Sequence, residues 1–177
     1  MGQRSGSLDG NLWAYLAGIV DGEGYVTIKR SGTLHEYKDK SYCYKAYSPV
    51  IAIAMTDQKF IVWMKEITNI KGQLWVRKFP NPRWRPSYTL SFHGANAIQL
   101  AKNILPYSRI KKPQLEILMK YPIGDHRRSQ RLKRDNLYWE MREVNLQSRH
   151  QQRLSEETLK HLNSRKQQSE LLQMING

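Results

Sequence analysis

The sequence is poor in cysteine, in acidic side chains and in long apolar runs. Its 177 residues include one cysteine, Cys43, which excludes an internal disulfide and a thiolate metal cluster. No apolar run approaches the length of a membrane span, and the first residues lack the apolar stretch of a signal peptide. We therefore expect an intracellular protein that is not secreted and has no membrane partner.

Acidic residues are too few to balance the basic ones. Lys and Arg total 29 while Asp and Glu total 15, so the net charge is +14. Solubility alone rarely requires a pI of about 10.0. The excess instead indicates a polyanionic partner, with nucleic acid as the leading candidate.

Hydrophobic periodicity predicts an α+β chain. A polar loop is expected at 31–40, Asn11 is expected to cap the first helix, and Pro49 suggests a bend or an edge position. The expected elements are helix 11–21, strand 25–30, strand 41–55, a helix within 56–70, strand 73–79, strand 87–92, helix 94–104 and a helix from 113. This order is typical of one antiparallel sheet covered by helices on one face.

The composition changes after Gly124, where Arg, Gln and Glu dominate. We expect one domain over residues 1–124 and a basic helical extension over 125–177, packed on or beside it. Further helices are predicted near 135–148 and 156–175. The basic segment from His126 to Arg134 either binds phosphates or extends a dimer interface.

The end of the first helix, "LAGIVDGEG" over residues 16–24, has an unusual composition. Ala14, Gly18 and Gly22 are spaced four apart, so one helix face is nearly bare backbone. Such a face packs closely either against another helix or against the sheet of the same chain. Asp21 and Glu23 lie where the helix already carries partial negative charge, which disfavours acids. Carboxylates and free carbonyls together instead suit a divalent cation such as Mg²⁺.

This nonapeptide resembles the signature of the LAGLIDADG homing endonucleases. Five positions are identical, Ile19 and Val20 remain apolar, and Glu23 remains acidic. The resemblance covers about residues 11–121 and implies an αββαββα domain with a saddle-shaped antiparallel sheet. It does not explain the extra C-terminal helices, which are expected from periodicity alone. Members with one motif act as homodimers. The resemblance therefore implies a dimer interface at Ala14, Gly18, Asp21 and Gly22.

The resemblance also implies the catalytic groups. Glu23 and the Gly22 carbonyl would bind Mg²⁺, for which Mn²⁺ would substitute, and the metal would assist phosphodiester hydrolysis. Lys111 and Lys59 match basic positions of the family's active site, and Met55 stands where many members carry a water-ordering Gln.

Lys111 has a second, local argument. Since Pro113 suits the first turn of a helix, Lys111 lies near a helix N-terminus, where a positive charge is unfavourable unless an anion such as a phosphate is close. A solvated surface lysine is the other interpretation of the sequence alone.

The polar face of the sheet is the expected DNA-reading surface, since its side chains alternate with buried ones. For each residue taken singly, a merely solvated face remains an alternative. The predicted DNA-binding residues are Thr27, Lys29, Arg30, Gln73, Trp75, Arg77, Arg83, Arg85, Thr89 and Ser91.

The sequence thus predicts a homodimeric, Mg²⁺-dependent, site-specific endonuclease of double-stranded DNA. It would cut a long, nearly palindromic site and leave short 3′ overhangs, as the family does. The alternatives are an intron maturase that binds structured RNA without cleavage, and a non-enzymatic DNA-binding regulator on the same scaffold. Glu23 favours the enzyme, because a carboxylate facing phosphates weakens binding when no metal intervenes.

Overall fold

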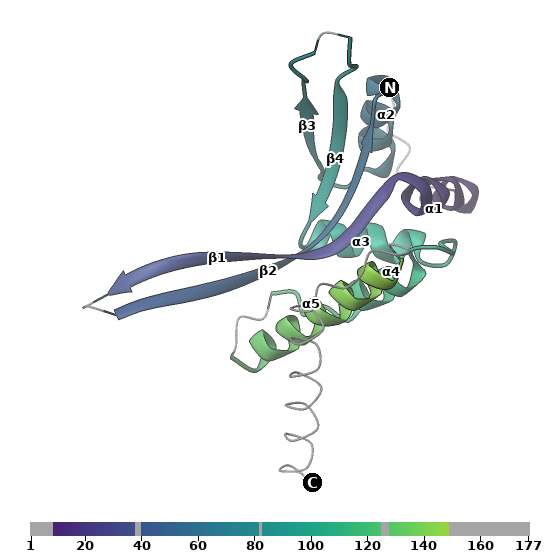
Figure 1. Cartoon of the computed structure of the whole chain (residues 1–177). Coiled ribbons are helices and arrows are strands. Elements are labelled where there is room, and N and C mark those ends of the chain that lie inside the picture. Colours follow the sequence, from purple (N-terminus) through teal and green to yellow (C-terminus); the bar gives the residue numbers. More distant parts are fainter. Residues whose placement is uncertain (1–8, 38–39, 82, 125–127, 149–177) are drawn as a thin grey trace, which may run out of the picture.

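A computed structural model describes residues 9–37, 40–81, 83–124 and 128–148 of the chain (Figure 1). The helix predicted at 156–175 lies outside these residues. The elements are α1 (Gly10–Glu23), β1 (Gly24–Tyr37), β2 (Lys40–Met55), α2 (Gln58–Thr68), β3 (Gln73–Arg77), β4 (Ser87–His93), α3 (Ala95–Ile104), α4 (Lys112–Met119) and α5 (Arg128–Ser148). The predicted α+β class is confirmed, although α1 is capped by Asp9 and not by Asn11.

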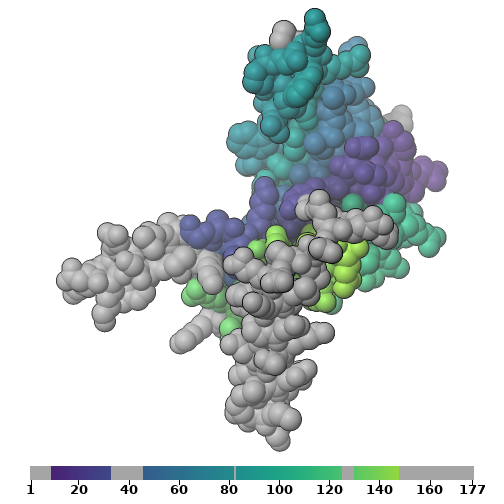
Figure 2. Space-filling view, in the orientation of Figure 1, coloured from purple at the N-terminus to yellow at the C-terminus, as the bar shows by residue number. Residues whose placement is uncertain are grey.

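The strands form one antiparallel sheet in the order β1-β2-β4-β3. One rung crosses all four strands, with Gly24 opposite Ile53, Ile53 opposite Leu90, and Leu90 opposite Leu74. From this rung the sheet spreads into two wings, one made by β3, β4 and the end of β2, the other by the outer parts of β1 and β2 (Figure 1). The wings give the sheet its saddle shape, and Figure 2 shows the wing of β3 and β4, in teal, rising above α1, in purple.

The predicted loop at 31–40 is wrong. β1 continues to Tyr37 and β2 begins at Lys40, and the two remain paired throughout. Figure 1 shows this two-stranded ribbon extending away from the helices. Backbone hydrogen bonds pair two strands whatever their side chains are, and this polar segment lacks the apolar alternation of a half-buried strand, so its sequence resembled a loop.

The core lies between the helices and one face of the sheet. α1 contributes Leu16, Ala17 and Val20, all buried. Full burial of a Val, Leu, Ile or Phe side chain contributes roughly 1.5–3 kcal/mol. The strands and the later helices contribute Val26, Ile28, Ile51, Ile53, Leu90, Phe92, Ala97, Leu100, Leu115 and Leu118.

Helix α5 packs onto this core and along the free edge of β1. It begins at Arg128, earlier than the predicted 135, and buries Leu137 and Met141 in the core cluster. Asn145 Nδ2 donates to the Val26 carbonyl at 3.1 Å, and Gln114 Nε2 donates to Asn145 Oδ1 at 3.3 Å. These bonds join α5 to both the sheet and α4. None of the helices described is long and apolar enough to cross a membrane.

Candidate functional site

One face of α1 is bare. Ala14, Gly18 and Gly22 are exposed, and a Cβ atom added at either glycine would meet no atom within 4 Å. The hypothesis that this face packs against the chain's own sheet is therefore wrong, since Leu16 and Val20 on the other side do so. The bare face is available to a second helix.

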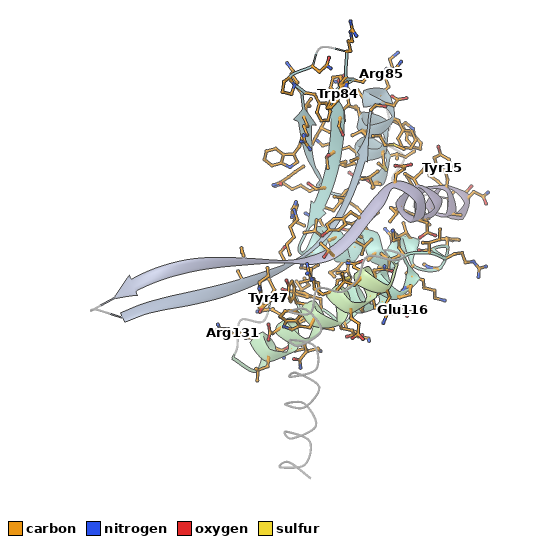
Figure 3. All side chains as sticks on the ribbon, in the orientation of Figure 1. Tyr15, Tyr47, Trp84, Arg85, Glu116 and Arg131 are labelled. Atoms are coloured by element: carbon orange, nitrogen blue, oxygen red, sulfur yellow. The ribbon has the colours of Figure 1, made fainter. Side chains whose placement is uncertain are left out.

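Aromatic side chains border that face. Tyr15 is 51% exposed, and its ring packs edge-on against Phe60 and Trp63 of α2, with centroids 6.3 and 6.2 Å apart. Figure 3 shows Tyr15 projecting from α1. The contacts place the first turn of α2, and with it the exposed Lys59, beside α1.

Asp21 is tied to the segment that precedes α4. Its carboxylate accepts four hydrogen bonds, from Ser108 Oγ at 2.6 Å and from the backbone N–H groups of Arg109, Ile110 and Lys111 at 2.7, 3.1 and 2.9 Å. Burial alone would raise the pKa of Asp21, but these four bonds outweigh it and lower the pKa below its ordinary value. Asp21 therefore fixes the segment that leads into α4, 87 to 90 residues further along the chain.

This bond network explains the position of Lys111. The residue is the N-cap of α4, and Pro113 lies in the first turn, as predicted. The anion expected beside Lys111 is supplied by the chain itself, as the Asp21 carboxylate. The same bonds tie the backbone of Lys111 to the last turn of α1, which ends at Glu23.

Glu23 differs from Asp21. It is exposed, and no hydrogen bond or ion pair joins it to another residue that the structure describes. The last helical bond of α1 runs from Gly24 N–H to the Val20 carbonyl, so the carbonyls after Val20 lack helical partners. Gly24 is required here, since a Cβ atom would lie 2.3 Å from the Val20 oxygen.

A carboxylate beside free carbonyls is an all-oxygen donor set, and it fits the preference of Mg²⁺. Glu23 and the Gly22 carbonyl are the groups that would hold the ion. In the described part of the chain no three His, Cys, Asp or Glu residues gather in a metal-binding group. At Met55 the side chain is partly buried against the core, so it offers no polar group to water.

The sheet face turned away from the core carries most of the predicted DNA-binding residues. In register, Gln73 lies opposite Ser91, Trp75 opposite Thr89 and Arg77 opposite Ser87. Lys29 is exposed, and Trp75 is 61% exposed although it is a large aromatic residue.

Thr27 and Ser91 lie on this face but are 4% and 5% exposed. Thr27 lines a pocket of about 70 Å³ between β1 and α5, and the Ser91 hydroxyl donates to the Gln73 carbonyl at 3.4 Å. Their side chains are therefore less available to a partner than the alternation predicted.

Arg30 lies on the other face of the sheet. Its guanidinium stacks on the rings of Tyr138 and Trp139 of α5, 4.9 and 5.6 Å from their centroids. Because successive side chains of a strand alternate, Arg30 cannot share the face of Lys29. The assignment of Arg30 to the DNA-reading surface is corrected accordingly.

The loop between β3 and β4 forms the tip of one wing. Figure 3 shows Trp84 and Arg85 there, and both Arg83 and Arg85 are exposed. Trp84 packs against Phe79 with centroids 5.5 Å apart, and the Arg77 guanidinium lies 5.0 Å from the Phe79 ring. Arg77 is thus held by a stack that leaves its guanidinium edge available.

His93 is a residue of this face that the sequence analysis missed. It follows Ser91 by two positions on β4, and its Nε2 lies 3.2 Å from Ser91 Oγ. The strand was predicted to end at 92. Continuing the alternation of Thr89 and Ser91 by one step would have found it.

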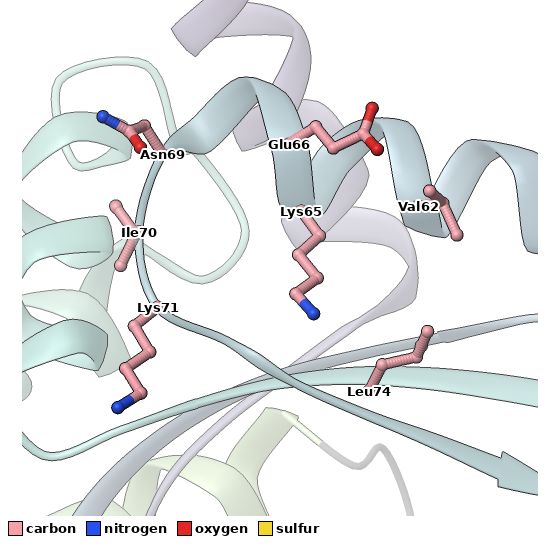
Figure 4. Close-up of a pocket in the computed structure, with 7 residues that line it drawn as sticks. All are labelled: Val62, Lys65, Glu66, Asn69, Ile70, Lys71 and Leu74. Atoms are coloured by element: carbon pink, nitrogen blue, oxygen red, sulfur yellow. The ribbon is translucent and has the colours of Figure 1, made fainter.

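A larger hollow lies elsewhere, between α2 and the start of β3 (Figure 4). Its volume is about 470 Å³, and it opens on the helix-covered side of the sheet. It contains none of the predicted site residues. Its lining residues are Val62, Lys65, Glu66, Asn69, Ile70, Lys71 and Leu74.

Solved structures share this architecture. The homing endonuclease I-CvuI, solved in complex with a DNA target in the presence of Mg, superposes with a TM-score of 0.53 at 20% identity, covering 87% of this chain and 96% of that one. The archaeal intron-encoded homing endonuclease I-Vdi141I, complexed with DNA, gives a TM-score of 0.57 at 17% identity, covering 76% and 84%. The I-LtrWI LAGLIDADG homing endonuclease, bound to target DNA, gives 0.50 at 19% identity, covering 80% and 46%.

The chain has the LAGLIDADG homing endonuclease fold. No protein-family model and no curated protein matches the sequence itself. Within the LAGLIDADG fold, the nonapeptide over 16–24 occupies the end of α1 and leads into β1, which runs on to the junction of the two wings (Figure 1).

Proposed function

We propose that this protein is a site-specific endonuclease of double-stranded DNA that acts as a homodimer with Mg²⁺. The observation that carries the proposal is the end of α1. There an exposed Glu23 stands without a partner among the described residues, beside a helix face that is bare backbone at Gly18 and Gly22. A structural acid would be bonded, as Asp21 is, and a structural glycine face would be packed.

The bare face supports the proposed homodimer. Two copies of α1 packed through Ala14, Gly18 and Gly22 would bring two Glu23 side chains close together, and a two-fold axis makes each residue meet its equivalent. The Tyr15 cluster would then border the contact with apolar surface. A two-fold dimer would recognise a long, nearly palindromic DNA target.

The chain's own groups divide the work at each scissile phosphate. Glu23 and the Gly22 carbonyl would hold the ion, which when bound supplies an acidified water and charge neutralisation. Lys111, fixed by Asp21, and Lys59, at the start of α2, would hold the phosphate by their positive charge. The polar sheet face would fix the register of the DNA, and cleavage of both strands would leave short 3′ overhangs.

DNA binding is supported by charge and shape together. The net charge is +14, and two wings bound an open, polar face that includes Lys29, Arg77, Arg83 and Arg85. Arg and Lys can contact both phosphates and base edges in the major groove. I-CvuI, I-Vdi141I and I-LtrWI, which share the fold, were each solved with DNA.

The decisive experiment is selection of cleaved sites from a random double-stranded DNA pool with Mg²⁺, in parallel with the Glu23→Gln variant. The proposal expects one long, nearly palindromic consensus from the parent and none from the variant. A binding consensus without cleavage would instead indicate a DNA-binding regulator. Preference for structured RNA over every DNA would indicate a maturase.

A further inference from the structure

His93 occupies a central place on the open sheet face. In register it lies opposite Val50, which lies opposite Thr27, three residues along β1 from the rung of Gly24. At ~3.3 Å per residue along a strand and ~4.8 Å between neighbouring strands, His93 lies roughly 14 Å from the end of α1. Figure 1 shows that β4, whose last residue is His93, ends where the two wings meet.

The hydrogen bonds around His93 favour one assignment of its ring nitrogens. Ser91 Oγ donates its only proton to the Gln73 carbonyl. With its proton directed to Gln73, Ser91 accepts from His93, which favours the tautomer that carries the hydrogen on Nε2, 3.2 Å from Ser91 Oγ. In a neutral imidazole with a protonated Nε2, the Nδ1 atom is an unprotonated acceptor.

The neutral form is the one that the surroundings favour. Partial burial, followed by the positive charge of Lys29, lowers the pKa of His93 below its ordinary value. Nδ1 makes no hydrogen bond within the described part of the chain, and it is not among the buried polar atoms that lack a partner there. Nδ1 is therefore not sealed inside the protein.

We propose that His93 is a specificity-determining residue whose Nδ1 accepts a hydrogen bond from the exocyclic amino group of one base in each DNA half-site. The inference rests on the proposed function and deepens it. In the major groove only adenine N6 and cytosine N4 present amino donors, whereas guanine and thymine present acceptors. Lys29 and Arg77 are donors only, so they suit the acceptors, and His93 supplies a fixed acceptor among them.

The Ser91 hydroxyl is a positioning group in this arrangement. It holds the tautomer and the ring plane of His93, and it is nearly buried, so it is not itself placed to contact DNA. Ser91→Ala should therefore relax the preference at the same base position as a His93 change, without creating a new one.

The test uses the target obtained by selection with the full-length protein. Each base pair of a half-site is replaced in turn by the other three, and binding is measured for the parent and for His93→Lys. The parent should prefer adenine or cytosine at one inner position by about three- to tenfold, the range for one net hydrogen bond. His93→Lys, which has donors only, should move that preference to guanine or thymine and leave the other positions unchanged.

Two controls make the outcome specific. Thr89→Val, on the same strand and face, should leave the His93 position unchanged. At that position the parent should lose about three- to tenfold in affinity when the base is replaced by one that lacks only the amino group, and His93→Leu should lose nothing further. This base-analogue arm needs only the parent protein, so it remains decisive if a variant folds poorly.

Two results would overturn the inference. One is a parent profile with no position sensitive to amino-group removal, and the other is a His93→Lys profile identical to that of the parent. Failure to select any DNA target would overturn the proposed function and this inference together. A selected target that lacks an amino-sensitive position would overturn this inference alone.

Discussion

The last turn of α1 has two sides with opposite properties. On the inner side, Asp21 accepts four hydrogen bonds and is tied to the start of α4. On the outer side, Glu23 is exposed and unbonded within the described chain, next to bare glycines. Two positions apart on a helix means about 200° of rotation, which separates the two acids into different surroundings. Asp21 therefore stabilises the fold, whereas Glu23 is available to bind a metal ion or a substrate.

The largest effect should come from the outer acid. Glu23→Gln keeps the size of the side chain but removes its charge, so cleavage should fall by more than the roughly 100-fold that loss of an outer-shell metal partner costs. DNA affinity should persist or increase, and thermal stability should not change, because Glu23 supports no contact. Single-turnover cleavage, binding and melting measurements check the three expectations. A variant that cuts as fast as the parent would refute the role of Glu23.

The second-largest effect is expected from a substitution on the bare face of α1. Gly18→Leu meets no atom of its own chain within 4 Å, so the monomer should remain folded. Across a close helix pair the same side chain overpacks, which should weaken the dimer by at least ~1–3 kcal/mol. Sedimentation should show monomers, with loss of cleavage. Gln99→Leu, at an exposed position of α3, is the matched control and should remain dimeric. A stable, active Gly18→Leu dimer contradicts the proposed interface.

The inner acid should affect stability first. Asp21→Asn replaces one acceptor oxygen with a donor that faces backbone N–H groups, so the protein should lose about 1–2 kcal/mol, as when a helix cap is removed. Cleavage should also decrease, because Lys111 is no longer fixed. Asp57 caps α2 by accepting from Phe60 N–H, and Asp57→Asn retains that bond, so it should be nearly neutral in chemical denaturation. Equal effects of the two changes would show that Asp21 is an ordinary surface acid.

The smallest effect is in the pH dependence of stability. Since the folded state lowers the pKa of Asp21, the carboxylate stabilises the fold above the unfolded pKa of about 3.9, and this contribution is lost as the pH falls through the folded pKa. The difference in unfolding free energy between the parent and Asp21→Asn should therefore be constant near neutrality and shrink below about pH 4. A difference that does not shrink in acid would mean that the charge of Asp21 is not what its partners bind.

Local pattern was sufficient for most of the fold. Helical spacing located α1, and strand alternation distinguished Val26 and Ile28 from the side chains that face away from the core. The nonapeptide indicated both acids and the bare face. The nonapeptide did not indicate what Asp21 binds. The partners of Asp21 lie 87 to 90 residues away, and three of them are backbone N–H groups, which cannot be identified from the type of residue.

The wrong predictions share a physical cause. Each concerned a residue whose surroundings are set by segments distant in the sequence and not by its sequence neighbours. The 31–40 segment pairs as a ribbon because β2 lies opposite, and Arg30 is drawn to the other face by the rings of α5. Thr27 lies on the predicted face but is buried beside α5. The proposed role of His93 depends on Ser91, whose hydroxyl donates to the Gln73 carbonyl of a neighbouring strand.

The bond from Asn145 to the Val26 carbonyl also has a meaning for synthesis on the ribosome. The two residues are 119 positions apart. At a synthesis rate of ~5–20 residues per second, the edge of β1 is therefore uncovered for on the order of ten seconds before α5 has been synthesised. During that interval a strand edge is open to pairing with other nascent chains. Chains that terminate before residue 145 would keep this edge permanently open, and we expect them to accumulate as insoluble protein even though every proposed catalytic residue is already present.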